Sequence, residues 1–379
     1  MSRRDVVFAF YGLSWSASME RGMHFAQDRL AARLIGENRV RRLVIANLPR
    51  SAAAWAVRRA LGQEREPPYQ AHVSLCQPLR LRRRDPHQLG ELRRAYARYE
   101  RCVRRSAARA GLEDPAVITT NPFFAAFGNF SWAGAVTYYA TDDWTGHPVY
   151  RRWWPALEEA YASIRERECA VCSVSQAILD RIRPMGPARV IPNGIEPSEW
   201  PPLPPAPAWL SGLPAPRLIY LGTLDRRLDP AALRALAASH PEGSVVLVGP
   251  IMDEDHIRGL LRIPNVQVRP PVSRSEVPGL LRGADVGLVP HARDKLTLAM
   301  SPLKAYEYLA AGVPVAGISL PPLEGIDPRV ALVDEASQLG GAVNRALSLG
   351  RASENVRQQF LDQNAWKRRH EQILELALR

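Results

Sequence analysis

Short apolar runs alternate with segments of helical character along most of the 379-residue chain, and this alternation constrains the fold more than any other feature. The runs are continuous rather than alternately polar, which is typical of strands covered on both faces of a sheet. Strands that alternate with helices indicate parallel sheets in an α/β fold. The sequence predicts strands at 5–11, 40–47, 71–76, 116–120, 134–140, 169–173, 189–191, 217–221, 244–248, 266–268, 285–289 and 313–316.

The alternation is interrupted where eight prolines fall within the twenty residues 197–216. Proline fixes φ and removes a backbone donor, so this segment predicts a semi-rigid linker between two domains. We expect an N-terminal Rossmann-like domain over 1–198, the linker over 199–216, a second such domain over 217–355 and a terminal helix over 356–379 that crosses back. Because ligands of open α/β sheets bind beyond the carboxyl ends of the strands, the two doubly wound domains should face a central cleft.

The formal charge of +12 is unevenly distributed. Eleven arginines and only three acidic residues fall between Arg80 and Arg109, within a segment whose apolar residues recur at helical spacing. This predicts a basic amphipathic helix over about 87–111. Such a helix is either the solvated face of a packed element or a surface that binds an anionic membrane. Nucleic acid is not expected as a partner, because no zinc-finger or RNP-type pattern is present.

Four cysteines in so long a chain do not form a disulfide framework, which favours a reduced cytosolic setting. Cys169 and Cys172 have the spacing of a metal or redox pair, yet they fall in a predicted buried strand and no second pair accompanies them. A metal site is therefore not expected. The N-terminus does not read as a signal peptide, and no apolar stretch is long enough to span a bilayer. We expect a cytoplasmic protein that could bind peripherally to the inner face of the membrane.

The strongest motif is SPLKAYEYLAAGVPV at 301–315. Ser301 would be an N-cap with Pro302 at the first helical position, and the free N–H groups at a helix start bind anions. Lys304 could add a point charge to a phosphate, and Glu307 could reach a pair of ribose hydroxyls. The alternative is that this is an ordinary helix of an α/β domain that begins with Ser-Pro.

This motif resembles the donor-site helix of GT-B glycosyltransferases near family 4 and of related bacterial polysaccharide glycosyltransferases, such as those of the teichuronic-acid and xanthan glucuronosyltransferase type. VIPNGI at 190–195 is similar to the segment that closes their N-terminal domain. The stretches 138–144 and 266–289 also resemble segments of these enzymes, and Trp366 fits their terminal helix. Together the matches follow the family's order over most of the chain.

The resemblance implies sugar transfer from a nucleoside-diphosphate sugar, with UDP or GDP as the nucleotide, to a hydroxyl of a glycan, lipid-linked or small-molecule acceptor. No cofactor or metal is expected, since this fold usually replaces the metal with helix ends and cations. The donor-binding residues implied are Gly222, Thr223, Arg227, Val268, Ser301, Leu303, Lys304 and Glu307.

The sequence departs from the family 4 pattern at two positions. Ala299 stands where a first glutamate is expected, and Thr223 stands where an arginine usually follows Gly222. These departures favour the subgroup in which an N-domain carboxylate does the acid/base work. They also leave open a catalytically silent GT-B partner protein, a natural-product tailoring enzyme or, less readily, a GT-B sugar-nucleotide epimerase.

An inverting transferase needs one general base near the acceptor hydroxyl. Asp142 and Asp143 follow a predicted strand, and Asp142 is favoured because a similar acidic residue ends this strand in the subgroup. Either aspartate could instead cap the following turn. His24 is the rival base, on a helix predicted over 19–34, and it could equally be a partly exposed helix histidine. His147 and His291 are weaker candidates.

Overall fold

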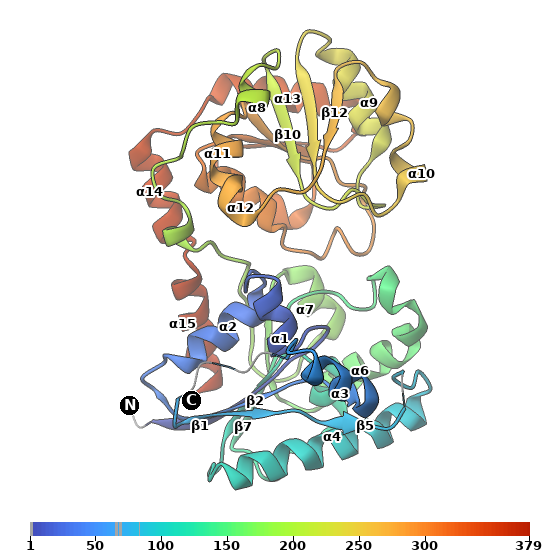
Figure 1. The fold of residues 1–379 in the computed structure, drawn as a ribbon, viewed down its shortest axis with the longest axis vertical. Helices are drawn as coiled ribbons and strands as arrows, with labels where there is room; N and C mark the ends of the chain where they lie inside the picture. The colour runs from blue at the N-terminus through green and yellow to red at the C-terminus, as the bar shows by residue number, and fades with distance from the viewer. Residues whose placement is uncertain (1–2, 65–66, 68–69, 83) are drawn as a thin grey trace. The chain divides into compact units, whose positions relative to one another are not determined.

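The computed structural model describes residues 3–64, 67, 70–82 and 84–379. The chain divides into two compact units (Figure 1). The first unit comprises Met1–Pro192 and Arg369–Arg379, and the second comprises Asn193–Arg368. Each unit holds one large parallel sheet covered by helices, which confirms the predicted α/β class. That the two sheets face one cleft stays a prediction.

The sheet of the first unit has seven strands, all parallel, in the order β4-β2-β1-β6-β7-β8-β9. Strand β1 lies inside this sheet and is buried from its second residue onward, as the continuous apolar run VVFA requires. The strands are β1 (Arg4–Ala9), β2 (Val40–Ala46), β4 (Val73–Cys76), β6 (Ala116–Thr119), β7 (Ala135–Ala140), β8 (Ala170–Ser173) and β9 (Ala188–Val190). A separate parallel pair joins β3 (Arg50–Ser51) to β5 (Leu79–Arg80).

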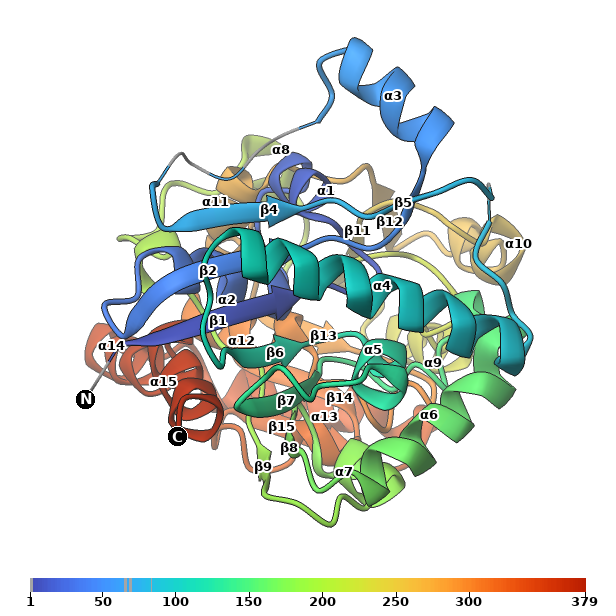
Figure 2. The same cartoon turned by 90° about the horizontal axis from the view of Figure 1, so that it is seen from below.

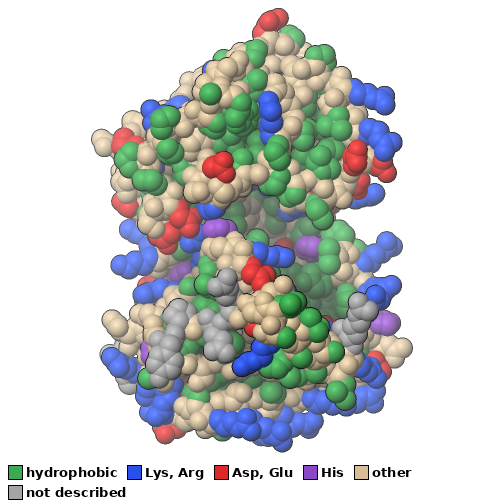
Figure 3. Space-filling model, viewed as in Figure 1, with side chains coloured by type: hydrophobic (Ala, Val, Ile, Leu, Met, Phe, Trp, Pro, Cys, Tyr) green, Lys and Arg blue, Asp and Glu red, His purple; other side chains and the backbone are tan. Residues whose placement is uncertain are grey.

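Helices cover both faces of this sheet, with α2 on one face and the long helix α4 on the other (Figures 1 and 2). The buried stripe of α4 consists of Leu92, Tyr96, Tyr99 and Val103, as its apolar spacing predicts. Arginine side chains gather along the lower edge of this unit in Figure 3, where Figure 1 places α4. The helices are α1 (Trp15–Glu20), α2 (Ala26–Ile35), α3 (Ala52–Ala60), α4 (Leu89–Arg109), α5 (Pro122–Phe127), η1 (Pro148–Trp153), α6 (Trp154–Glu166) and α7 (Gln176–Ile182).

The second unit holds a six-stranded parallel sheet in the order β12-β11-β10-β13-β14-β15. The alternation of side chains along β10 divides the interior into two cores. Leu218 and Tyr220 pack with residues of α9 and α13, whereas Ile219 and Leu221 pack with residues of α11, α12 and α14. The strands are β10 (Arg217–Leu221), β11 (Ser244–Val248), β12 (Val266–Arg269), β13 (Val286–Val289), β14 (Val315–Ile318) and β15 (Val330–Val333).

The helices of the second unit connect these strands, and the short turns are 3₁₀ helices. They are η2 (Pro197–Glu199), α8 (Ala208–Ser211), α9 (Pro230–Ser239), α10 (Glu254–Ile257), η3 (Leu260–Arg262), η4 (Arg274–Glu276), α11 (Val277–Arg282), α12 (Leu303–Ala310), η5 (Pro321–Leu323), η6 (Ala336–Gln338), α13 (Leu339–Leu349) and α14 (Glu354–Gln363). The last helix, α15 (Trp366–Ala377), begins in the second unit and ends among residues that belong to the first.

The Pro-rich segment is packed rather than a spacer, which corrects the linker assignment. The division between the units falls at Pro192, so the segment belongs wholly to the second unit. Trp200 and Leu210 are buried in the core beside α11 and α14, and the segment forms η2 and α8. Burial of these two side chains outweighs the lack of a regular backbone ladder.

Two helices predicted as continuous are broken. The predicted helix over 19–34 is α1 and α2, separated by a turn in which Gly22 and Met23 have φ of +81° and +57°. The terminal helix is α14 and α15, because Asn364 and Trp366 form backbone hydrogen bonds with Ile195 instead of continuing the helix. Strand β15 was not predicted, since its four residues follow a turn-rich stretch with no distinctive pattern.

Candidate functional site

The carboxyl ends of β10 and β11 meet in a close backbone approach that only glycine permits. Gly222 follows β10 with φ +144°, and its N–H donates to the carbonyl of Val248. Gly249 follows β11 with φ +153°, and a Cβ there would collide with the carbonyl oxygen of Gly222. Gly222 was predicted as a site residue, whereas Gly249 was missed. The signal that could have found it is a second glycine directly after the neighbouring buried strand.

The start of α12 corrects one prediction. Pro302 has an extended backbone with ψ 104°, so the helix begins at Leu303 and Ser301 is not its N-cap. The Ser301 hydroxyl instead accepts a hydrogen bond from the Asn193 N–H at 3.1 Å, and its carbonyl accepts one from Asn193 Nδ2 at 2.7 Å. No side chain caps α12. The Ala305 N–H donates to the Pro302 carbonyl at 3.1 Å, so the N–H groups of Leu303 and Lys304 are those left for an anion.

Lys304 lies in the first turn of α12, and its ammonium has unusual neighbours. Nζ lies 3.3 Å from Nε2 of the buried His291 and 5.0 Å from the centre of the Tyr220 ring. A Cβ on Gly222 would lie 3.3 Å from Lys304 Cε. Burial, together with the charge of Arg227, lowers the pKa of Lys304 to about 7. No described carboxylate forms an ion pair with this ammonium.

His291 stays neutral in this environment. Burial lowers its pKa well below the usual range, and the charges of Lys304 and Arg227 lower it further. An ammonium has no lone pair, so Lys304 donates and Nε2 of the imidazole accepts. His291 was predicted from the sequence as a weaker candidate for the base. In the structure its Nε2 contacts the Lys304 ammonium.

Arg227 and Thr223 lie in the turn that follows Gly222, as predicted. The guanidinium of Arg227 pairs with Asp225 at 2.8 Å, and the hydroxyl of Tyr220 donates to the carbonyl of Thr223 at 3.1 Å. Asp225 was not predicted. The charge of Arg227 is therefore balanced by Asp225, whereas Lys304 forms no ion pair with a described carboxylate.

Glu307 is held by a residue that sequence reasoning missed. Arg274, in η4, forms ion pairs with both Glu307 and Glu199, and its guanidinium lies 5.6 Å from the Trp200 ring centre. Arg274 is 75 residues from Glu199 and 33 from Glu307, so no local pattern connects the three. A ribose bound here would share the Glu307 carboxylate with Arg274.

The two remaining predicted donor contacts, Leu303 and Val268, also lie in this unit, and both are half-buried. Leu303 is half-buried at the first position of α12. Val268 is half-buried on the edge strand β12, and it packs against the core on the α9 side. Their roles in donor binding stay predictions, as do those of the other predicted contacts.

In the first unit, the two aspartates after β7 have different environments. Asp143 is 2% exposed, and its carboxylate accepts hydrogen bonds from the Thr145 N–H at 3.0 Å and hydroxyl at 2.6 Å. It therefore stabilises the turn, as the capping alternative predicts. Asp142 is half-buried, and its carboxylate accepts a hydrogen bond from the Asp143 N–H at 3.1 Å. Burial and the charge of Asp142 raise the pKa of Tyr150 to about 12.

Aromatic rings connect the loops that follow β1 and β7. Tyr11 stacks on Tyr150 with a centroid distance of 5.5 Å and meets Trp144 edge-on at 4.8 Å. His147 packs on Trp144 at 6.2 Å. Asp142 thus belongs to an aromatic-rich edge at the carboxyl ends of the strands.

His24 lies in the turn between α1 and α2, not on a helix, which corrects its predicted placement. A Cβ at Gly22 would come 2.5 Å from His24 Nε2, so the ring folds back over its own turn.

The described residues contain no group of three or more His, Cys, Asp or Glu side chains that could hold a metal ion. Cys169 is half-buried and Cys172 is buried, and all four cysteines are free thiols. Within the described part of the chain, no helix is both long and apolar enough to cross a membrane.

With this geometry in place, solved structures of similar fold can be compared. Sucrose-phosphate synthase from Thermosynechococcus elongatus aligns over 98% of both chains with a TM-score of 0.67 and 17% identity. A UDP-forming trehalose-phosphate synthase from Burkholderia xenovorans aligns over 100% of this chain and 99% of its own, with a TM-score of 0.66 and 16% identity. The chain has the GT-B fold. Anabaena HepE, solved with UDP and glucose, is a further GT-B match, at a TM-score of 0.63 and 14% identity over 98% of both chains.

At the sequence level, no family model matches this GT-B chain. A protein described as the teichuronic acid biosynthesis glycosyltransferase TuaH of Bacillus subtilis (strain 168) is 34% identical over 104 residues. That match covers 27% of this chain and 26% of TuaH. The chain therefore spans about a quarter of the length of this curated relative.

Proposed function

We propose that this protein is a glycosyltransferase that moves a sugar from a nucleoside-diphosphate sugar to an acceptor hydroxyl. The observation that carries the proposal is the ammonium of Lys304, half-buried between the Gly222 turn and the uncapped start of α12. A cation in this setting lacks a carboxylate partner and is stabilised by an incoming anion. A diphosphate supplies that anion and also accepts hydrogen bonds from the helix N–H groups.

The reaction we propose is a direct displacement at the anomeric carbon of the donor sugar. Asp142 takes the proton of the acceptor hydroxyl, and the resulting oxygen forms a bond to the anomeric carbon. The bond from that carbon to the diphosphate breaks, and the nucleoside diphosphate leaves with both bonding electrons. Lys304 and the α12 amides stabilise the charge that develops on it. No metal takes part in this scheme.

The comparisons support this proposal without defining the donor. HepE was solved with UDP and with UDP-glucose, which makes UDP-glucose the first probe to test here. TuaH is named for teichuronic acid biosynthesis, which favours a polysaccharide or cell-envelope acceptor. We place the reaction in the cytoplasm, with peripheral binding to the membrane as an extension that depends on the acceptor.

A catalytically silent GT-B protein is the second candidate, and one observation favours it. The Glu307 carboxylate is already paired with Arg274, and Ala299 stands where the resembling enzymes have a first glutamate. A natural-product tailoring transferase differs from the first proposal only in its acceptor. Transfer or hydrolysis of a donor separates both enzymes from the silent protein.

Calorimetric titration with UDP, GDP, ADP and dTDP and their sugars tests the donor site. We expect one nucleotide to bind the wild type and to bind at least about tenfold more weakly to Lys304→Met. The control is Lys367→Met, which removes an exposed lysine of the same unit and should leave the affinity unchanged. If Lys304→Met binds every nucleotide as tightly as the wild type does, the proposed site is refuted. Binding without transfer to any hydroxyl acceptor would favour the silent protein.

A further inference from the structure

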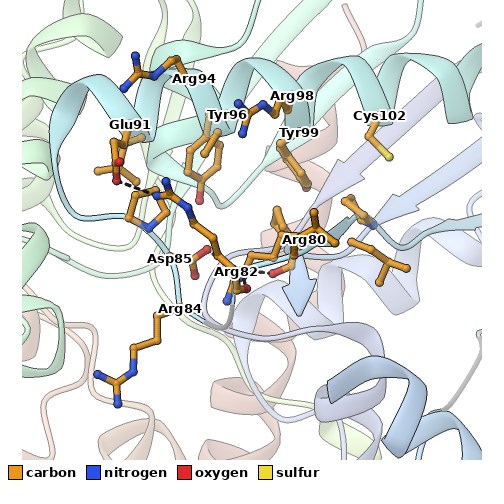
Figure 4. Close-up of a pocket in the computed structure, with 17 residues that line it drawn as sticks. Arg80, Arg82, Arg84, Asp85, Glu91, Arg94, Tyr96, Arg98, Tyr99 and Cys102 are labelled. Carbon is orange, nitrogen blue, oxygen red and sulfur yellow. Dashed lines mark hydrogen bonds and ion pairs between the residues drawn. The ribbon is translucent and has the colours of Figure 1, made fainter. Parts of the chain in front are cut away.

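A cavity of about 740 Å³ lies in the first unit between α4 and the segment that contains β5, and none of the predicted site residues lines it. Five arginines contribute to its lining: Arg80, Arg82, Arg84, Arg94 and Arg98. Its size is within the range of small-molecule sites. In Figure 4, Tyr96 and Tyr99 descend from α4 toward Arg80 and Arg82, while Arg94 and Arg98 lie above them on the same helix.

The charges around this cavity are not balanced. Arg80 pairs with Asp85, and Arg82 pairs with Glu91 at 3.0 Å. Arg84, Arg94 and Arg98 line the same cavity and form no hydrogen bond or ion pair with another described residue. Arg94 and Arg98 are one helical turn apart, where like charges repel each other. A bound anion would relieve that repulsion.

The cavity also offers apolar surface. Leu92 and Tyr99 are buried in its lining, at 1% and 2% exposure. Leu79 and Leu81 flank Arg80 and are 48% and 97% exposed. An anion alone would leave these side chains in water, whereas an anion joined to an apolar chain would cover them.

Hydrogen bonds join the walls of this cavity to segments near the sheet edge that carries Asp142. The indole N–H of Trp153 donates to the carbonyl of Pro86 at 2.8 Å, which ties the arginine-bearing segment to η1. Tyr150 of η1 stacks on Tyr11, as described above. On the α4 side, the Tyr96 hydroxyl accepts a hydrogen bond from Asn121 Nδ2 at 3.3 Å, directly after β6.

We propose that this cavity binds a phosphate or diphosphate that is esterified to an apolar chain. If the chain is the glycosyltransferase proposed above, the ligand is the anchored end of its acceptor. The arginines hold its phosphate groups through bidentate hydrogen bonds, and the leucines contact its apolar part. The same chemistry is offered by a lipid headgroup in a bilayer and by a soluble phosphate amphiphile.

Octyl phosphate, below its micellar concentration, is the first probe, and its affinity is measured by calorimetry. Arg94→Ala/Arg98→Ala should weaken binding at least about tenfold. Arg101→Ala/Arg105→Ala removes the same charge from exposed positions of α4 that do not line the cavity, and its affinity should stay within about twofold of the wild type. Equal losses in both double variants would show diffuse electrostatics and overturn the site.

Two control ligands separate the two parts of the proposed ligand. Octyl glucoside carries the apolar chain without phosphate, and inorganic phosphate carries the charge without the chain. Both should bind more weakly than octyl phosphate. If octyl glucoside binds as well as octyl phosphate, the cavity does not recognise phosphate. If inorganic phosphate binds as well, it does not recognise the chain. Either result overturns the proposal.

Sedimentation with phosphatidylcholine vesicles, with and without phosphatidylglycerol, distinguishes the sources. If the wild type binds the anionic vesicles, and Arg94→Ala/Arg98→Ala abolishes this binding while Arg101→Ala/Arg105→Ala does not, the ligand is a bilayer lipid. If the wild type binds octyl phosphate but no vesicles, the ligand is a soluble amphiphile. A wild type that binds neither probe overturns the proposal. The nucleotide titration is independent: a chain that binds octyl phosphate but no nucleotide refutes the proposed function and leaves this site standing.

Discussion

Binding of a nucleotide sugar should draw a proton into the protein at Lys304, and the number of protons should depend on pH. In the free protein burial and the charge of Arg227 lower the pKa of Lys304 to about 7, and the carboxylates of Glu307 and Asp225 offset only part of this shift. A diphosphate placed against it favours the charged form and should return the pKa toward the ordinary value of about 10.4.

The expected magnitude follows from these two values. At pH 8 about nine in ten free molecules have a neutral Lys304, so binding should take up about 0.9 proton. At pH 6 the amine is already charged, and uptake should fall to about 0.1 proton. The same linkage weakens the apparent affinity about tenfold between pH 6 and pH 8. His291 adds nothing over this range, because burial keeps its pKa well below the usual value.

Calorimetry in buffers of different ionisation enthalpy measures this uptake directly. UDP-glucose is the preferred ligand, since neither of its phosphates titrates near neutral pH, whereas the terminal phosphate of UDP does. Lys304→Met should bind more weakly and take up almost no proton at either pH. Uptake that is the same at pH 6 and pH 8, or that persists in Lys304→Met, would refute the assignment of the diphosphate to this ammonium.

Three further predictions concern the described residues. Asp142→Asn should lower the transfer rate by at least about a hundredfold while nucleotide affinity is unchanged, whereas Asp143→Ala should lower the free energy of unfolding by about 1–3 kcal/mol because Thr145 loses two hydrogen bonds. Rate assays and urea denaturation of both variants test these roles. If Asp143→Ala alone were inactive, and as stable as the wild type, the two roles would have to be exchanged. Gly222→Ala should destabilise the fold by about 1–3 kcal/mol and weaken nucleotide binding, because φ is +144° and the new Cβ would crowd Lys304; a variant as stable as the wild type would contradict the strain argument. Burial raises the pKa of Asp28 to about 7, so its carboxylate costs stability as pH rises from about 4 to 7. Asp28→Asn should therefore stabilise the protein by up to about 4 kcal/mol at pH 8 with no gain at pH 4, measured by thermal unfolding at both values.

Much of the fold could be predicted because the signals are local. Continuous apolar runs predicted every strand of the two large sheets except β15, and the helical spacing of Leu92, Tyr96 and Tyr99 predicted the buried stripe of α4. Gly222 and Lys304, 82 positions apart in sequence, were both predicted for the donor site, and the structure places Lys304 Cε within 3.3 Å of a Cβ built on Gly222. A sheet that collects the carboxyl ends of its strands at one edge makes such distant predictions converge.

What could not be predicted depends on partners that are distant in sequence or on single backbone angles. Arg274 reaches Glu307 and Glu199 across long separations, and nothing near Arg274 indicates either partner. The extended backbone of Pro302 moves the start of α12 by one residue and removes the cap expected from Ser301. Trp200 packs into a core although prolines surround it, because burial of a large ring does not need a regular pattern of neighbours.

The position of Lys304 also makes its amine a target for selective covalent labelling. Of the fifty Lys and Arg residues only three are lysines, and Lys295 and Lys367 are both exposed. An amine with a pKa of about 7 is about half deprotonated at neutral pH, whereas a lysine in water keeps its proton and does not react as a nucleophile. An anionic acylating or aldehyde reagent at neutral pH should therefore modify Lys304 first. The candidate donor site can thus be labelled covalently in the unmutated protein, and a bound nucleotide should protect it.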